Sequence, residues 1–370
     1  MKFILILFLL SIQAFAFDYP YTMRSPKGLL MGDAFTAVND DEFTLFYNPA
    51  SLARPKNDFK LFPINPQLSG TNILSDLDRF KDFPDEPVGA SKVLMDYPVH
   101  ASAGFAPGFK LFNVGVSFIS SQSYDLLLRN RAQPILDIDI RQDKGVMIGF
   151  GIPLGPDRLS KKTKTGTQTS IGITGKYIER SGINDSMSLT GTTVTSALGK
   201  KKIEDIVAAL GKTKGQGYGG DIGLEHIVRG NGSQFVMGLS ALDVGGTSFK
   251  VDKNPDDLKV SDIRSQFNFG MAAGQDYKIF HYILSLDVRG LNEQMDTGKR
   301  LRLGAELGLP GIKLMAGVNS GYLSYGAMLD LFILKVTAGF YDVELGSKYQ
   351  QVQGKRFIIY ASLFDFSFDA

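Results

Sequence analysis

The sequence contains no cysteine and no tryptophan, and only three histidines. Without cysteine, the chain can form no disulfide, no thiol nucleophile and no cysteine-based metal site. His100, His226 and His281 lie far apart in the sequence, without the spacing of metal ligands, so no metal is expected. A net charge of +2 gives no support for nucleic-acid binding. These features favour an exported protein without a cofactor.

Long hydrophobic runs are also missing, apart from one short run at the N-terminus. Lys2 supplies a positive charge, and Phe3 to Ile12 are apolar but too few to span a bilayer comfortably. Ala14-Phe15-Ala16 fits the small-x-small cleavage pattern of a signal peptide. We therefore expect residues 1–16 to be a cleaved signal peptide and the mature chain to begin at Phe17. An uncleaved anchor is the alternative.

Glycine and aromatic residues are abundant, with 41 Gly, 27 Phe and 14 Tyr, and the mean hydropathy is −0.01. From Pro98 onward, apolar and polar residues alternate in short runs separated by turn residues. We expect separate strands at 135–141 and 146–154, for example, and a final strand with Tyr360, Phe364, Phe366 and Phe368 on one face. This pattern predicts an all-β fold, a transmembrane antiparallel β-barrel of 12 to 16 strands, with a secreted sandwich as the alternative.

The stretch from Gly32 to Ala53 differs from the alternating segments. Ala34, Ala37 and Val38 have the spacing of a short helical turn. Asn48-Pro49-Ala50 follows, in which Pro49 fixes its own φ and restricts the preceding residue. We interpret this stretch as a hatch that fills the barrel.

In Gly32, Ala34, Ala37 and Asn48-Pro49-Ala50, this stretch resembles the N-terminal hatch of FadL-type outer-membrane transporters and of their PorV-like relatives. The resemblance implies a barrel of 14 strands in the outer membrane of a Gram-negative cell. The expected organisation is a hatch segment at 17–56 and a barrel at 57–370, with a long loop insertion near 184–214 that carries a short helix.

The resemblance also implies a function without catalysis: transport or binding of hydrophobic or amphipathic molecules, with a fatty-acid-like ligand. Expected partners are outer-membrane lipid and the barrel-assembly machinery. One alternative is a PorV-like partner protein for a secretion system. Another is a general porin or structural barrel.

Six charged residues of the C-terminal third fall on the polar face of predicted strands and are expected to face the lumen: Asp287, Arg289, Arg300, Arg302, Glu306 and Lys335. A symmetrical hairpin would place Asp287 opposite Arg302. The charges either neutralise one another in a hydrated barrel or form a constriction that selects solutes. They argue against a wholly apolar tunnel.

Two motifs with catalytic or binding precedents receive simpler interpretations. Gly215, Gly217 and Gly220 match G-x-G-x-x-G, but the expected helix–strand order around them is the reverse of that in a dinucleotide-binding fold. Asp40-Asp41-Glu42 could bind a cation, and a solvated acidic turn is the simpler interpretation. We expect no enzyme and no cofactor.

Overall fold

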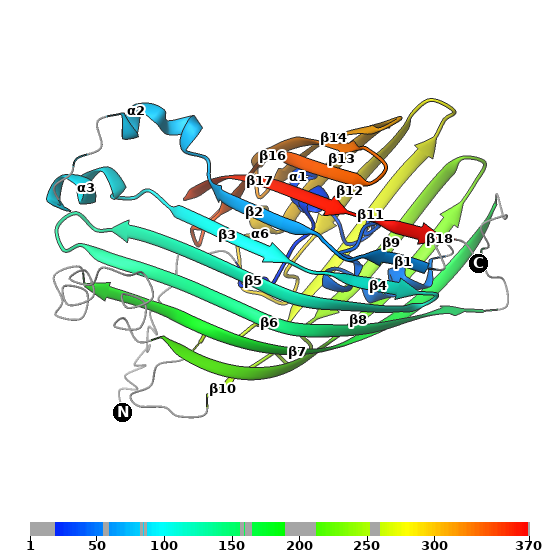
Figure 1. The fold of residues 1–370 in the computed structure, drawn as a ribbon, viewed down its shortest axis with the longest axis horizontal. Helices are drawn as coiled ribbons and strands as arrows, with labels where there is room; N and C mark the ends of the chain where they lie inside the picture. Colours follow the sequence, from blue (N-terminus) through cyan, green and yellow to red (C-terminus); the bar gives the residue numbers. More distant parts are fainter. Residues whose placement is uncertain are drawn as a thin grey trace, which may run out of the picture.

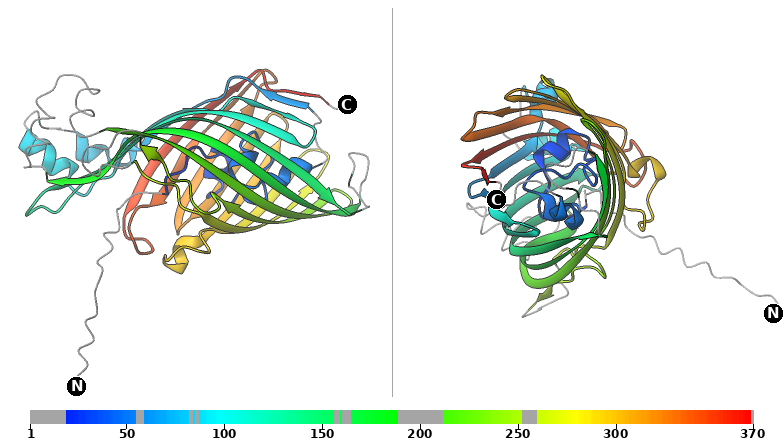
Figure 2. Two further views of the ribbon diagram at one scale, coloured as in Figure 1. Left: turned by 90° about the horizontal axis from the view of Figure 1, so that it is seen from below. Right: turned by 90° about the vertical axis from the view of Figure 1, so that its right-hand side faces the viewer.

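The computed structural model describes residues 19–54, 59–81, 84, 87–155, 159, 165–188, 212–251 and 260–368. Within them, a single antiparallel sheet closes on itself as a barrel (Figures 1 and 2). Its wall consists of β2 (Pro66–Thr71), β3 (Val99–Phe105), β5 (Val114–Arg129), β6 (Ile135–Leu154), β7 (Gly166–Ser188), β8 (Thr213–Arg229), β9 (Ser233–Leu242), β11 (Gln266–Asp276), β12 (His281–Val288), β13 (Leu301–Leu309), β14 (Ile312–Asn319), β15 (Tyr322–Asp330), β16 (Leu334–Glu344) and β17 (Gln353–Leu363). Because β17 pairs with β2, the ring is complete and no wall strand is left as an edge. The predicted barrel of about 14 strands is confirmed.

Three neighbouring wall strands are interrupted near one end. β1 (Phe59–Phe62), β4 (Gly108–Leu111) and β18 (Phe366–Phe368) continue β2, β3 and β17 beyond short breaks, and β1 pairs with both β4 and β18. At the break, the side chain of Asn65 bonds to both the carbonyl oxygen and the amide of Ala106, at 2.7 and 2.9 Å. The amide side chain thus replaces missing ladder bonds at this seam. A further short strand, β10 (Lys250–Val251), pairs with β8.

Connections of very different length lie at the two ends of the barrel. Tight turns such as 112–113, 310–311 and 331–333 are at one end, the short-turn end, where the barrel also begins and finishes. Long connections are at the opposite end, and one of them carries a 3₁₀ turn (Ile73–Asp76), α2 (Leu77–Phe80) and α3 (Pro87–Leu94). Another carries α6 (Thr297–Arg300). Outer-membrane barrels have this asymmetry, with their long loops outside the cell.

The outer surface of the wall is apolar over a defined height. On β8, Tyr218, Ile222, Leu224 and Val228 point outward and are 40–75% exposed. From Tyr218 to Val228 is about ten residue steps of ~3.3 Å, which at a strand tilt of ~40° spans ~25 Å, the height of the apolar band of such barrels. Inward-facing residues of the same strand, including Glu225, are buried. The alternation is therefore that of a membrane barrel rather than a secreted sandwich.

Three strands continue well past this apolar band at the long-connection end. β6 has 20 residues and β7 has 23, whereas β13 has 9. β5, β6 and β7 therefore project from the rim as a sheet of their own, close to α2 and α3 (Figure 1). The expected break between strands at 135–141 and 146–154 was wrong, because the polar residues between them belong to the projecting part of one continuous strand.

The predicted insertion near 184–214 is bordered by strands that extend into it. β7 runs to Ser188 and β8 begins at Thr213. Residues 189–211, with the expected short helix, lie outside the described residues, as do residues 1–18 with the expected signal peptide. Among the helices of the described part, none is long and apolar enough to cross a membrane.

The N-terminal residues 19–54, the plug, lie inside the barrel (Figure 2, right). They contain α1 (Pro26–Leu30) and two 3₁₀ turns, Thr44–Phe46 and Pro49–Ala53. The helical turn expected from Ala34, Ala37 and Val38 is a single turn, closed by the amide of Asn39 on the carbonyl oxygen of Phe35 at 3.0 Å. Leu30, Met31, Phe35, Phe43 and Tyr47 are completely or almost completely buried, so the apolar core of the molecule lies around the plug.

One aromatic residue of the last strand faces the opposite way from the expectation. Tyr360 is 3% exposed and points inward, where its hydroxyl donates to the Glu42 carboxylate of the plug. Its ring packs on Phe43 with 5.9 Å between ring centres. Phe364 has a φ of +58° and breaks the strand, so the alternation does not continue from Tyr360 into β18.

Candidate functional site

The Asn48-Pro49-Ala50 turn is seated on the inner face of β7 and β8. The Asn48 side chain accepts a bond from the amide of Ala50 at 3.1 Å and donates to the carbonyl oxygen of Leu224 at 3.2 Å. Beneath the turn, Gly172 and Gly223 are direct partners in the ladder. A Cβ on Gly172 would lie 2.3 Å from the backbone of Ala50, and one on Gly223 2.0 Å from Oδ1 of Asn48. Glycine is required here because the turn reaches the wall backbone.

A second close approach involves Gly32, whose φ of +65° suits glycine. A Cβ on Gly317 would lie 2.3 Å from the nitrogen of Gly32, and one on Gly304 2.5 Å from the carbonyl oxygen of Met31. Gly304 and Gly317 are again ladder partners. Three more facing pairs receive plug residues: Gly326 with Gly339 under Leu30, Gly238 with Gly270 under Thr36, and Gly115 with Gly149 under Leu45 and Leu52. The expected hatch residues Ala34, Ala37 and Ala50 are buried.

Two of the predicted lumen charges hold the middle of the plug. Asp287 accepts bonds from the amides of Phe35 and Thr36 at 3.0 and 2.8 Å. Arg289 forms an ion pair with Asp33, and its guanidinium lies 5.2 Å from the ring centres of Tyr21 and Tyr47. Both wall residues are almost completely buried. They therefore act on the plug and not on solvent.

Glu306, a third predicted charge, joins the plug to the part of the wall that lies toward the short-turn end. Its carboxylate pairs with Lys27 of the plug at 2.6 Å and with His281 at 2.9 Å. Lys27 is 2% exposed and also pairs with Asp40 at 2.9 Å. Burial alone lowers the pKa of Lys27, but the carboxylates of Asp40 and Glu306 outweigh burial and raise the pKa above its usual range. Lys27 therefore stays charged inside the barrel.

The end of the plug is fixed by Arg54 and Glu225. The guanidinium of Arg54 donates to both carboxylate oxygens of Glu225, which also accepts a bond from Ser51 at 2.7 Å. The same guanidinium donates to the carbonyl oxygens of Ala37 and Val38. A bidentate pair of this kind fixes direction as well as distance, so it ties two turns of the plug to β8.

The other three predicted charges lie near the ends of the barrel and contact wall or loop residues there. The ladder pairs Asp287 with Arg302, as predicted. Arg302 donates to Ser320, and Arg300 donates to the carbonyl oxygen of Glu293, both at the long-connection end. Lys335 pairs with Asp365 at 2.6 Å near the seam. The structure thus brings three of the six charges together around the plug, and a constriction that selects solutes remains a prediction.

Among the cavities beside the plug, a larger and a smaller one lie toward opposite ends of the barrel. The larger of the two, of about 340 Å³, lies toward the short-turn end. Its apolar wall contains Val38, Val236, Ala272 and Ile283, and its basic side chains are Arg54, Lys60, Lys110, Arg229 and Lys313, with Asp40, Asp41 and Asp276 as the acidic ones. The apolar wall could contact the apolar part of an amphipathic molecule, and the charged side chains could bind its polar group.

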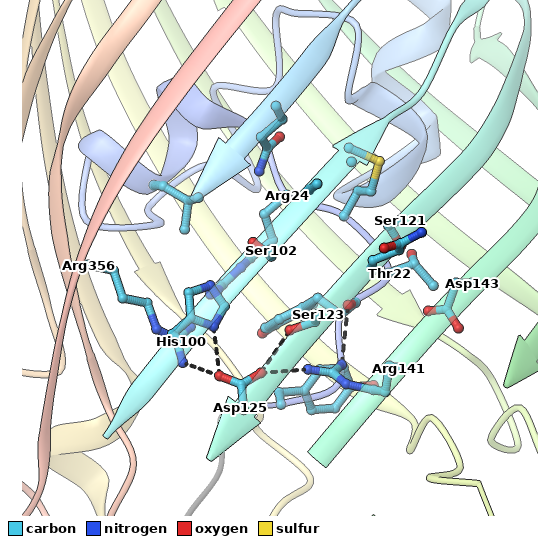
Figure 3. Close-up of a pocket in the computed structure, with 18 of the residues that line it drawn as sticks. Thr22, Arg24, His100, Ser102, Ser121, Ser123, Asp125, Arg141, Asp143 and Arg356 are labelled. Atoms are coloured by element: carbon cyan, nitrogen blue, oxygen red, sulfur yellow. Dashed lines mark hydrogen bonds and ion pairs between the residues drawn. The ribbon is translucent and has the colours of Figure 1, made fainter. Parts of the chain in front are cut away.

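The smaller cavity, of about 70 Å³, lies toward the long-connection end (Figure 3). Three basic side chains contact the carboxylate of Asp125 in its lining. The nitrogen–oxygen distances are 2.7 Å for His100, 3.0 Å for Arg356 and 3.6 Å for Arg141. Ser123 donates to the same carboxylate at 2.8 Å. The carboxylate of Asp125 thus compensates part of the positive charge of Arg141 and Arg356 beside this cavity.

In the acidic turn of the plug, Asp40 is exposed, whereas Asp41 and Glu42 are half-buried. Asp41 accepts bonds from the Ser25 hydroxyl and from the amide of Phe43. Burial, with Glu42 and Asp40 beside it, raises the pKa of Asp41 to about 7. Glu42 lies 3.7 Å from Lys60. In the described residues, no group of three or more histidine and carboxylate side chains is arranged to hold a metal ion.

Several residues of this site were missed from the sequence. Glu225 and Arg54 belong to no motif, and neither do the wall glycines that face the plug. A usable signal was present, since Gly172 and Gly223 occupy inward positions of strongly alternating strands, where a missing side chain leaves room for another segment. Gly215, Gly217 and Gly220 all lie within β8, which is incompatible with a strand–turn–helix dinucleotide motif.

No family model matches this chain, and no curated protein matches it. Solved structures do. The chain is similar to CdiB from Acinetobacter baumannii, at 8% identity and a TM-score of 0.37, over 83% of this chain and 60% of CdiB. It is similar to a Pseudomonas aeruginosa FadL homologue, at 9% identity and a TM-score of 0.31, over 95% and 99% of the two chains. It is also similar to the Pseudomonas putida toluene transporter TodX, at 7% identity and a TM-score of 0.39, over 92% of this chain and 98% of TodX. FadL-type barrels are thus among the solved structures to which this chain is similar.

Proposed function

We propose that this chain is an outer-membrane barrel that transports or holds amphipathic small molecules, with the plug as the hatch that closes its lumen. The observation that carries the proposal is the plug itself, which is docked by Arg289, Glu306 and Glu225 between a small outer cavity and a large inner one. A structural barrel needs no such segment, and an open porin would be blocked by it.

The larger cavity supports a ligand with an apolar body and an anionic group. Val38, Val236 and Ile283 offer apolar contact, while Lys110, Arg229 and three other basic side chains line the same space. A fatty-acid-like molecule has this chemistry. At the broken seam beside Asn65 the ladders of three neighbouring strands are interrupted, so the seam is the proposed side exit toward the membrane.

Uptake of a fluorescent fatty acid by cells that produce the full chain tests this proposal. We expect uptake above that of cells without the protein, and a several-fold loss for the double variant Arg229→Gln/Lys313→Gln. Lys278→Gln, an exposed lysine on a turn at the same end, is the matched control and should leave uptake unchanged. Uptake equal to that of cells without the protein, together with swelling of liposomes in small sugars, would instead indicate a porin.

The projecting sheet of β5, β6 and β7 favours one second function, a partner protein for secretion or surface attachment. These strands extend beyond the apolar band and offer a surface outside the membrane (Figure 1). Shortening the β5–β6 hairpin at 127–137 separates the two functions. Fatty-acid uptake should survive this change if the barrel is a transporter.

A further inference from the structure

The outer face of β6, β7 and β8 changes from apolar to charged between one outward row of side chains and the next. Val146, Tyr177 and Tyr218 form one outward row across these strands, and the two tyrosine rings are 5.2 Å apart. The next outward row toward the long-connection end contains Lys144 and Glu179. Interfacial tyrosines mark the edge of the hydrocarbon region, so the second row lies at the level of the lipid headgroups.

Three lysines lie in this row or in the rows that follow it toward the long-connection end. Lys144 is on β6, Lys214 is on β8, and Lys212 directly precedes β8 on the same outward side; all three are exposed. Lys214 pairs with Glu179 at 2.8 Å, and Lys212 donates to the side chain of Gln142 at 3.2 Å. The cluster therefore carries three positive charges and one negative charge, on adjacent strands.

One pair of charged residues elsewhere at the long-connection end is balanced. On β16 and β17, Asp342 and Lys355 are ladder partners, and Lys355 also pairs with Asp76 at 2.9 Å. Charges of both signs there leave no surplus for an anion. The surplus at Lys144, Lys212 and Lys214 contrasts with this balanced pair, and the exposed Lys250, the ladder partner of Gln216 on β10, lies beside it.

We propose that Lys144, Lys212 and Lys214 form a binding site for the anionic headgroup of a membrane lipid in the leaflet at the long-connection end. Two residue steps of ~3.3 Å separate Val146 from Lys144 along β6, and four such steps separate Tyr218 from Lys214 along β8. A lysine stem lies along apolar surface while its ammonium group reaches the polar zone. The phosphate of a lipid anchored beside Tyr177 and Tyr218 therefore meets these ammonium groups, and the Gln142 and Gln216 side chains offer further donors.

The site is independent of the lumen and of the proposed transport, since all its residues point away from the plug. It would hold one or a few lipids against a particular sector of the wall, where β6 and β7 leave the membrane. A lipid fixed there supports the base of the projecting sheet.

Native mass spectrometry of the detergent-purified full chain tests the proposal, with phosphatidylglycerol as the anionic probe and phosphatidylcholine as the neutral one. With ~1 kcal/mol per lysine near a charged surface, the chain should retain phosphatidylglycerol at least about fivefold better. Lys144→Gln/Lys212→Gln/Lys214→Gln should abolish that preference. Glu179→Gln should increase it, because it removes the one opposing charge.

The matched control is Lys81→Gln/Lys278→Gln/Lys348→Gln, which changes the net charge equally at exposed lysines elsewhere. It should keep the wild-type preference. An unchanged preference in the first triple variant, or an equal loss in the control, would overturn the proposal. Displacement of phosphatidylglycerol by inorganic phosphate, but not by chloride at equal ionic strength, would overturn the lipid assignment in favour of a free anion. Should the triple variant fail to fold, Lys212→Gln and Glu179→Gln must still shift retention in opposite directions.

Discussion

Removing the guanidinium of Arg289 should open the barrel. Arg289 is 2% exposed and pairs with Asp33, which is 1% exposed. Arg289→Met keeps most of the side-chain volume but leaves the Asp33 carboxylate buried, with Arg24 3.8 Å away as its remaining ion-pair partner. Loss of one member of a buried ion pair costs about 3–5 kcal/mol. That cost falls on the docked plug, because Asp33 regains water when the plug leaves.

A penalty of this size raises the undocked fraction of the plug by roughly 10²–10⁴-fold. Conductance of single barrels in a planar bilayer reports this fraction directly, as the share of time spent open. Wild-type barrels should be closed almost always, and Arg289→Met barrels should open frequently. Protease digestion of the 19–54 segment from the long-connection side should accelerate in parallel.

The double variant Arg289→Met/Asp33→Asn removes both charges and provides the control. It should be less open than Arg289→Met alone, because no unpaired buried carboxylate remains. Arg129→Met makes the same chemical change at a half-exposed ion pair on the projecting sheet and should leave conductance unchanged. If Arg289→Met barrels stay as closed as wild type, the ion pair does not hold the plug and this reasoning is refuted.

Three further outcomes are expected. Gly172→Ala should displace the plug and increase conductance, because its Cβ would lie 2.3 Å from the backbone of Ala50, whereas Gly175→Ala on the same strand meets no atom within 4 Å and should behave as wild type. The docked plug raises the pKa of Asp41 to about 7, so docking should be strongest below about pH 4 and should weaken as the pH rises through 7. Conductance measured against pH should show this dependence for the wild type, and the Asp41→Asn variant should lack it. Intact-mass measurement of outer-membrane material should find a chain that begins at Phe17, and retention of residues 1–16 would contradict the export assignment.

The wall could be predicted from the sequence because its signal is local. Alternation along one strand decides which side chains face the lumen, and the structure confirms this for Leu301, Leu303 and Leu307, which are exposed, and for Glu306, which is buried. The pairing of Asp287 with Arg302 followed from the symmetry of one hairpin. The strand count came from the FadL-type resemblance, since residue patterns alone allowed 12 to 16 strands.

What each lumen-facing residue contacts could not be predicted in this way. Asp287 binds the amide of Phe35, 252 positions earlier in the chain, and Tyr360 reaches Glu42 across 318 positions. These contacts exist only because the sheet closes and the plug threads its interior. Closure brings opposite walls within reach of one inner segment, and the path of that segment depends on which facing glycines leave it room. The sequence by itself determined a barrel, its inner and outer faces and the residues of the plug. Only the tertiary structure decided that Asp287, Arg289 and Glu306 hold the plug, because a charge facing a lumen finds its partner through space and not along the strand.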